Sequence, residues 1–394
     1  MRFSSIDIFC KVIDNFGDAG VVYRFAGEFK AAYPHLRMRV FIDDLRALNQ
    51  IEPGINLTAE VQDFESIRYI CMPDISSDDA EALGTAEIMI EAFACHIPEP
   101  LMKMAVHRSS LIINLEYLSA EDWVEGYHLK ESLLPEGRAR KFYFMPGFNT
   151  ATGGLILNSR LQRQKSQLLK NKVLFLNQQI SLSKSGPIDI GNKLIGTVFT
   201  YERGFDTFIK ELQEIGQQTV LLIFGEKSHA GFLASLQRLG VSVPENDFCE
   251  YGRIQFVIMP FTRQHDYDSL LCCADFNIVR GEDSLSRAVL SGKPFIWNAY
   301  LQQDRYQLVK TEALMNALYP YFEERAIFDN YRNLMIEFNS AETECSSQTT
   351  EEHYGDFFRN LNKIEHAVSK MSYFIHNNCD LVKNLGDFLG DYKN

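Results

Sequence analysis

The feature that most constrains this chain is an alternation of short apolar runs with helix-like segments, which occurs twice. The first series extends from residues 7–13 to residues 111–115, and the second from residues 193–199 to residues 294–297. Short apolar runs between helices predict parallel strands that are buried on both faces, because the crossover helices cover both sides of the sheet. We therefore expect an α/β fold with two Rossmann-like domains and no obvious sequence repeat between them.

The remaining strands and the domain limits follow from the same pattern. Length supports the division, because single cores stop growing beyond about 250–300 residues and this chain has 394. The other predicted strands are residues 38–42, 67–72, 87–91, 219–224, 254–259 and 276–279. We expect an N-terminal domain over residues 1–155, a largely helical connection over 156–190, a second domain over 191–340, and a helical segment over 341–394 that packs back on the first domain.

Charge and composition argue against several classes of protein. The net charge is −13, which disfavours nucleic-acid binding through a general basic surface. There is no apolar span of about 20 residues and no secretory leader pattern, so we expect a soluble, cytoplasmic protein without a membrane partner. The eight cysteines include no C-x-x-C pair, which argues against a zinc site.

Two carboxylates follow the first predicted strand. Asp14 and Asp18 are four residues apart and precede a helix-like segment. Open α/β sheets bind ligands outside the carboxyl ends of their strands, so this turn is a candidate site. It is not a dinucleotide fingerprint, because G-x-G-x-x-G is absent. The alternative is structural: Asp18 caps the helix and Asp14 stabilises the turn.

A second polar turn, Arg280 to Ser284, joins the strand-like residues 275–279 to a helix expected from Ser284. A glycine turn that opens a helix presents free backbone N–H groups to an anion. Arg280 adds a cationic fork suited to phosphate, and Ser284 adds a hydroxyl. The turn therefore predicts a site for an anionic leaving group, with helix capping by Asp283 or Ser284 as the structural alternative.

One further motif could be mistaken for a metal site. Asp266 and Asp268 flank Tyr267, and two carboxylates in a D-x-D motif can hold a divalent metal. Here the motif stands where a helix is expected to begin, and acidic residues are favoured there by capping and by the helix dipole. We therefore predict a helix start and no metal.

Taken together, the motifs resemble those of the EarP family, protein-arginine rhamnosyltransferases that modify translation elongation factor P. The resemblance rests on ordered blocks that cover most of the chain up to about residue 304: residues 8–18, 43–45, 90–93, 115–121, 146–148, 152–154, 260–261, 264, 266–268, 280–284 and 292–297. It implies a GT-B glycosyltransferase architecture, in which two Rossmann-like domains face each other across a cleft. It further implies metal-independent transfer, with inversion, of rhamnose from TDP-β-L-rhamnose to an arginine of elongation factor P, without a cofactor.

The resemblance also implies roles for individual residues. Asp18 is expected to be the base and Asp14 to hold the acceptor guanidinium, although the residues alone leave open which of the two is the base. Glu282 is expected to assist catalysis. The residues expected to bind the donor are Asn15, Phe16, Gly17, Phe199, Tyr201, Phe261, Gln264, Tyr267, Arg280, Gly281, Asp283 and Ser284. Among these, Phe199, Phe261 and Tyr267 would form a ring-lined slot for thymine, with Gln264 contacting a base edge.

Three other functions stay open at this point. A nucleotide-binding oxidoreductase would need the missing glycine fingerprint. A sugar-nucleotide epimerase, or another GT-B enzyme without a protein acceptor, would share the two-domain plan. A non-enzymatic partner of the translation machinery would require neither Asp18 nor Arg280.

Overall fold

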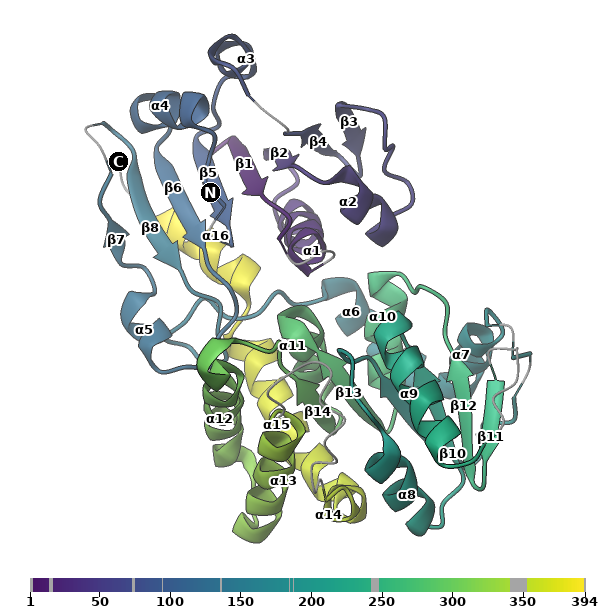
Figure 1. Ribbon diagram of the computed structural model, residues 1–394. Helices are drawn as coiled ribbons and strands as arrows, with labels where there is room; N and C mark the ends of the chain where they lie inside the picture. The colour runs from purple at the N-terminus through teal and green to yellow at the C-terminus, as the bar shows by residue number, and fades with distance from the viewer. Residues whose placement is uncertain are drawn as a thin grey trace. The chain divides into compact units, whose positions relative to one another are not determined.

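The computed structural model describes residues 3–13, 17–72, 75–93, 95–134, 137–183, 185–186, 188–241, 248–340 and 353–392. The chain forms two compact units (Figure 1). Unit 1 comprises Met1–Ser159 and Ile375–Asn394, and unit 2 comprises Arg160–Phe374. No helix in the described ranges is long and apolar enough to cross a membrane.

Unit 1 contains an eight-stranded sheet in the order β3-β4-β2-β1-β5-β6-β8-β7. Its outermost strands, β3 and β7, are antiparallel to their neighbours, and the six strands between them are parallel. The strands are β1 (Ser5–Cys10), β2 (Arg37–Ile42), β3 (Val61–Phe64), β4 (Ile67–Cys71), β5 (Ile88–Ala92), β6 (Leu111–Leu115), β7 (Glu131–Ser132) and β8 (Arg140–Phe144).

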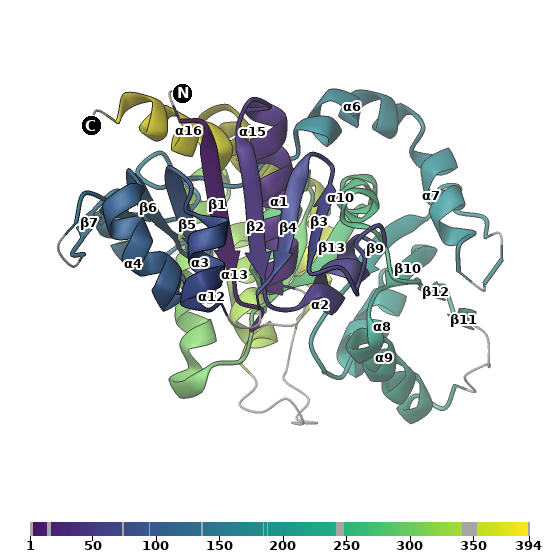
Figure 2. The ribbon, with the colours of Figure 1, turned by 90° about the horizontal axis from the view of Figure 1, so that it is seen from above.

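Helices cover both faces of this sheet (Figure 2). Successive residues of β1 point to opposite faces, so Ile8 packs in one core and Phe9 in the other. The Ile8 core includes residues of α1 (Gly17–Ala32), α2 (Leu45–Ile51) and α16 (Leu381–Asp391). The Phe9 core includes residues of α3 (Ser77–Leu83) and α4 (Glu99–Arg108). The short helix α5 (Trp123–Tyr127) follows β6.

The C-terminal residues complete unit 1. Leu155 and Asp380 form an isolated parallel bridge, which places α16 against the unit. A Cβ at Gly386 of α16 would overlap the ring and hydroxyl of Tyr33, which directly follows α1, so glycine allows these two segments to pack closely. Phe388 also packs edge to face on Phe142 of β8, with ring centroids 5.3 Å apart.

Unit 2 contains a six-stranded sheet in the order β11-β12-β10-β9-β13-β14, in which only β11 is antiparallel among the described strands. The strands are β9 (Leu194–Val198), β10 (Thr219–Ile223), β11 (Phe248–Tyr251), β12 (Ile254–Ile258), β13 (Phe276–Arg280) and β14 (Phe295–Asn298). The α-helices are α6 (Ser159–Lys170), α7 (Lys172–Ile180), α8 (Asp206–Glu214), α9 (Glu226–Arg238), α10 (Gln264–Cys273), α11 (Gly281–Ser291), α12 (Tyr306–Leu318), α13 (Arg325–Phe338), α14 (Gly355–Arg359) and α15 (Leu361–Asn378). Two 3₁₀ turns, η1 (Gln303–Arg305) and η2 (Tyr319–Tyr321), flank α12.

The two-sheet α/β fold confirms the main prediction from the sequence, but some elements differ. The helix expected from Ser284 begins at Gly281, directly after β13. Residues 140–144, for which no strand was predicted, form β8. The largely helical connection expected over residues 156–190 contains two helices, α6 and α7, with Asn171 between them. The short edge strands β3, β7 and β11 were not predicted, because brief half-exposed strands carry little periodic signal.

Candidate active site

Both sheets have a point at which the strand order reverses. In unit 1 the chain proceeds outward from β1 on one side and from β5 on the other, and in unit 2 it does so from β9 and β13. Ligands of open α/β sheets bind outside the carboxyl ends of the strands at such points. Each of the two polar turns follows one of these four strands, Asp18 after β1 and Arg280 at the end of β13.

Arg280 is held by aromatic rings and a backbone carbonyl. Its Cζ lies 4.2 Å from the centroid of the Phe199 ring and 5.0 Å from that of Tyr201. Its Nη1 donates to the carbonyl of Thr200 at 3.2 Å. A planar guanidinium stacks on rings in this way and keeps its charge at any physiological pH. The result is a fixed positive group at the carboxyl end of β13.

The backbone next to Arg280 requires glycine. Gly281 has φ +63°, and a Cβ there would lie 3.3 Å from the Tyr201 hydroxyl oxygen. The carbonyl of Gly281 accepts from Trp297 Nε1 at 2.9 Å, and the N–H of Tyr201 donates to Asn298 Oδ1 at 3.0 Å. The Tyr201 hydroxyl and the first turn of α11 are thus close together, so donor groups of both can face one anion.

The two carboxylates of this turn lie near cations. Glu282 Oε1 is 3.2 Å from Nζ of Lys310 on α12, and Asp283 Oδ1 is 3.7 Å from Nε of the buried Arg287. Ser284 is also buried. Asp283 and Ser284 lie inside the first turns of α11 rather than at its cap, which is Arg280, so the capping alternative is wrong.

The predicted ring-lined slot is only partly assembled. Phe199 and Tyr267 pack edge to face with centroids 6.0 Å apart. Burial of the Tyr267 hydroxyl raises its pKa, and the neighbouring Ser284 hydroxyl partly offsets this rise, so the phenol stays protonated. Phe261 is 65% exposed on the loop after β12, and Gln264 begins α10. Within the described residues, Phe261 makes no ring contact with Phe199 or Tyr267.

The D-x-D motif lies in a helix, as predicted. Asp266 stands in the first turn of α10, and Asp268 is buried in the following turn. Across the described part of the chain, no group of three or more His, Cys, Asp or Glu side chains is arranged to hold a metal ion.

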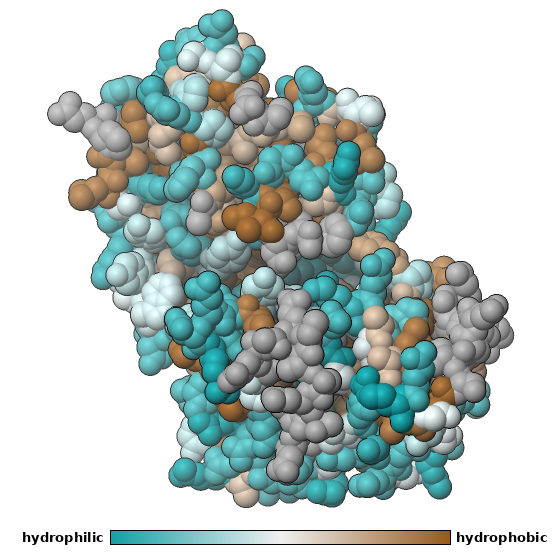
Figure 3. Space-filling model, viewed as in Figure 1, coloured by the Kyte–Doolittle hydropathy of each residue, from teal (hydrophilic) through white to brown (hydrophobic). Residues whose placement is uncertain are grey.

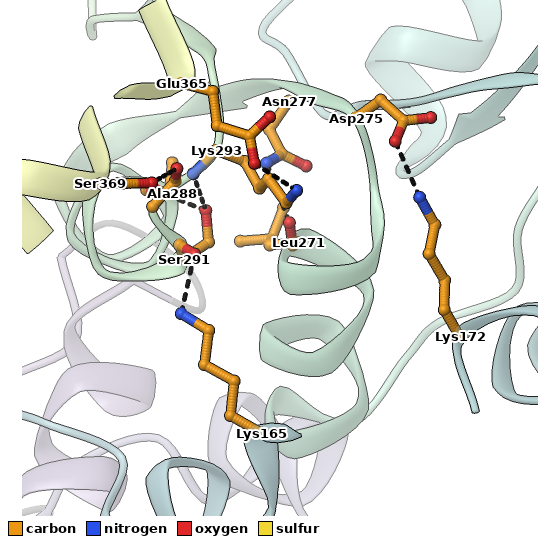
Figure 4. A network of polar contacts seen from close by, with 11 residues as sticks. Lys165, Lys172, Leu271, Asp275, Asn277, Ala288, Ser291, Lys293, Glu365 and Ser369 are labelled. Atoms are coloured by element: carbon orange, nitrogen blue, oxygen red, sulfur yellow. Dashed lines mark hydrogen bonds and ion pairs between the residues drawn. The ribbon is translucent and has the colours of Figure 1, made fainter. Parts of the chain in front are cut away.

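Helix α11, which carries the polar turn, is also fixed at its other end (Figure 4). Lys165 Nζ donates to the carbonyl of Ser291 at 3.0 Å, and Ser369 Oγ donates to that of Gly292 at 2.8 Å. Lys293 pairs with Glu365 of α15 at 2.6 Å. Donors to the last carbonyls of a helix satisfy groups that its own turns leave open. The C-terminal end of α11 is therefore anchored by residues of α6 and α15.

In unit 1, Asp18 is almost completely buried, with 2% of its surface exposed. Its Oδ2 accepts from the N–H of Ile13 at 2.9 Å, and its Oδ1 accepts from the Tyr117 hydroxyl at 3.1 Å. Gly17 is the first residue of α1. Asp14, Asn15 and Phe16, which were predicted to contribute to the site, lie outside the described residues.

Other residues around Asp18 were not predicted as site residues. Tyr117 stacks on Phe93, with ring centroids 4.9 Å apart, and Phe93 has a left-handed backbone with φ +57°. Such strain in a non-glycine residue is often found at functional sites. Asp43 accepts from the N–H of Val12 at 2.8 Å. Each of these residues comes directly or almost directly after a strand. That position was the sequence signal by which they could have been predicted as site residues.

The two Rossmann-like sheets place this protein in the GT-B fold class of glycosyltransferases. The structure of a UGT transferase from Siraitia grosvenorii in complex with UDP has the same fold, with a TM-score of 0.52 and 9% identity over 98% of this chain and 99% of that one. A second solved structure, on EarP-mediated arginine glycosylation of translation elongation factor EF-P, gives a TM-score of 0.64 with 20% identity over 99% of this chain and 100% of that one.

The particular family is defined by sequence. Residues 6–390 match the family model of EarP, the Elongation-Factor P (EF-P) rhamnosyltransferase, and the chain belongs to this family. It is 31% identical to a protein-arginine rhamnosyltransferase of Pseudomonas aeruginosa, over 86% of this chain and 87% of that protein. It is 35% identical to a protein of the same name from Shewanella oneidensis, over 78% of this chain and 79% of that protein. The resemblance seen in the sequence is thus confirmed.

Proposed function

We propose that this protein transfers rhamnose, with inversion and without a metal, from TDP-β-L-rhamnose to an arginine side chain of elongation factor P. Family membership supports the reaction class. The observation that carries the proposal is the position of Arg280, stacked on Phe199 beside the first turn of α11. Elongation factor P works in the cytoplasm, so we place the enzyme there.

Unit 2 supplies what a departing nucleoside diphosphate requires. Negative charge develops on the diphosphate as the bond to the sugar breaks, and preorganised donors stabilise it most where they need not move. Arg280, the first N–H groups of α11 and the Tyr201 hydroxyl are such donors. The exposed ring of Phe261 and the amide of Gln264 are assigned to the thymine. The Ser284 hydroxyl is assigned to the diphosphate. Glu282 and Asp283 are assigned to hydroxyls of the sugar or the ribose, and Glu282 is also assigned to assist catalysis.

Unit 1 supplies what an arginine acceptor requires. A guanidinium is protonated at physiological pH and is a poor nucleophile, so a carboxylate must hold it and remove a proton as the C–N bond forms. Asp18 is assigned as this base, because Ile13 and Tyr117 fix both of its oxygens. The guanidino nitrogen attacks the anomeric carbon and transfers its proton to Asp18. The bond from this carbon to the diphosphate breaks, and the diphosphate leaves from the opposite face. The role of Asp14 in holding the guanidinium stays a prediction.

The test is the mass of the acceptor. Purified protein is incubated with elongation factor P and TDP-rhamnose, and intact-mass analysis should show a gain of one deoxyhexose, which fragmentation locates on an arginine. Donor consumption with unchanged elongation factor P would instead support an epimerase or hydrolase, and the proposal would be wrong.

A matched pair of variants tests the base. Asp18→Asn should lower the rate by about 10²–10⁴-fold, the usual contribution of a general base, while TDP binding persists. Asp44→Asn is the control: Asp44 caps α2 by accepting from the N–H groups of Arg46 and Ala47, and asparagine caps equally well. Equal activity of the two variants would remove Asp18 from the mechanism.

A further inference from the structure

Helix α5 of unit 1 exposes aromatic side chains that the proposed reaction does not use. Trp123 and Tyr127 are each 49% exposed, and their rings meet edge to face with centroids 5.8 Å apart. Leu129, just beyond the helix, is 38% exposed. We refer to these three residues as the α5 patch. Over α5, Figure 3 shows a pale surface of intermediate hydropathy beside hydrophilic side chains. Exposed aromatic groups of this kind are typical of protein interfaces.

The α5 patch lies at the same end of the sheet as Asp18. Tyr117, which bonds Asp18, comes two residues after β6, and α5 begins six residues later. The patch is tied to β8, because the N–H of Leu129 donates to the carbonyl of Tyr143 at 2.8 Å and the Tyr127 ring lies 6.3 Å from that of Tyr143. The chain thus leads from the proposed base to the patch along one edge of unit 1.

The charge of this stretch selects the kind of partner. Residues 114–127 contain four carboxylates, Glu116, Glu121, Asp122 and Glu125, and no lysine or arginine. Asp122 and Glu125 are exposed beside the rings. Lys130, just outside this stretch, places its Nζ 5.0 Å from the Tyr127 ring centroid, so this ring already accepts a cation. A surface of rings and carboxylates fits basic side chains.

We propose that the α5 patch is a docking surface for the acceptor protein and binds basic side chains that surround the target arginine. This inference rests on the proposed function. An acidic surface attracts a basic partner and speeds its encounter. A second copy of this chain is a poorer fit, because its net charge is −13 and an acidic stretch would face an acidic protein.

The experiment distinguishes effects on acceptor binding from effects on donor binding. Steady-state kinetics are measured with elongation factor P as the varied substrate, and calorimetry measures its binding to the unmodified enzyme. Trp123→Ala should raise the KM for elongation factor P and its Kd by about 10-fold, as expected for an exposed anchor ring. The double variant Asp122→Asn/Glu125→Gln should also raise the KM and make it less sensitive to salt. Glutamine at 125 keeps an oxygen for Asn149, which donates to Glu125 at 2.7 Å. In all variants the KM for TDP-rhamnose should be unchanged.

Tyr373→Ala is the matched control, since this tyrosine is 74% exposed on α15 of unit 2. The proposal is overturned if Trp123→Ala binds elongation factor P like the wild type, if donor affinity and thermal stability fall together with acceptor affinity, or if the variants change only the oligomeric state. Failure of the proposed function is a different result, namely a wild-type enzyme that adds no sugar. The calorimetric binding of elongation factor P would still decide the role of the patch.

Discussion

The Tyr117 hydroxyl donates to Oδ1 of Asp18 at 3.1 Å, although 99 residues separate the two in sequence. The other carboxylate oxygen accepts from the backbone of Ile13, so the orientation of Asp18 is fixed from two sides. A general base must be held within hydrogen-bond reach of the proton it removes. Tyr117 is therefore a positioning residue for the proposed reaction.

Tyr117→Phe tests this role with the smallest possible change. Phenylalanine keeps the ring that stacks on Phe93 and removes only the hydroxyl. A hydrogen bond to a charged group contributes about 1.5–3 kcal/mol, so we expect kcat to fall by about 10-fold or more. The Kd for TDP should not change, because the groups assigned to the diphosphate and the thymine lie in unit 2. A wild-type kcat in this variant would show that the hydroxyl does not position Asp18.

Arg280→Lys separates charge from shape in the donor site. Lysine keeps the positive charge but loses the planar group that stacks on Phe199 at 4.2 Å. We expect about a 10-fold weaker Kd for TDP and a lower kcat for transfer, and a larger loss of both in Arg280→Ala. Arg238→Ala on α9, which removes an equal charge from a pair with Asp206, is the control. Unchanged TDP affinity in Arg280→Ala would contradict the diphosphate assignment.

The ion pair between Lys310 and Glu282 predicts a compensating pair of substitutions. Without Lys310, the Glu282 carboxylate would stand uncompensated beside the site assigned to a diphosphate, and like charges repel. Lys310→Met should therefore weaken TDP binding several-fold, while Lys310→Arg should not. The double variant Glu282→Gln/Lys310→Met should recover TDP affinity but not kcat, because Glu282 is assigned to catalysis. Calorimetric titration with TDP measures the affinity of each variant. If the double variant lost as much affinity as the two single variants together, Lys310 and Glu282 would not be coupled.

His128 predicts a pH dependence of stability. Burial lowers its pKa from 6.5 to about 4, and its Nδ1 accepts from the N–H of Met145 at 3.2 Å, which requires the neutral ring. The unfolded chain therefore binds more protons between these pH values, so this contribution is complete above pH 6.5 and is lost as the pH falls towards 4. It amounts to about 3 kcal/mol at most, from 1.36 kcal/mol per pKa unit.

His128→Gln is the matched test, because glutamine can accept the same hydrogen bond and does not titrate. Denaturant unfolding of the wild type should show a lower free energy of unfolding at pH 5 than at pH 7.5, and the variant should show a smaller difference. An identical pH dependence in both proteins would show that His128 does not cause it.

Local pattern was enough to predict much of this fold and the location of its polar turns. Buried strands such as residues 111–115 are apolar in sequence, and helices repeat their apolar residues every three to four positions, so each element is encoded in its own segment. A polar turn after such a strand, as at Asp18 or Arg280, must lie at the carboxyl edge of a sheet. The start of α11 was misplaced by three residues, because glycine at φ +63° can begin a helix as well as precede one.

The partners of those turns depended on tertiary structure alone. Tyr117 follows β6 and Asp18 follows β1, and they can meet because only β5 lies between these two strands in the sheet. No local pattern specifies that strand order. Phe199 lies under Arg280 because β9 and β13 are adjacent, although 81 positions separate the two residues. Hydrophobic periodicity acts over a few residues, whereas strand pairing depends on the packing of whole elements. The sequence by itself therefore determined which residues stand at the sheet edges, and only the tertiary structure decided which of them meet.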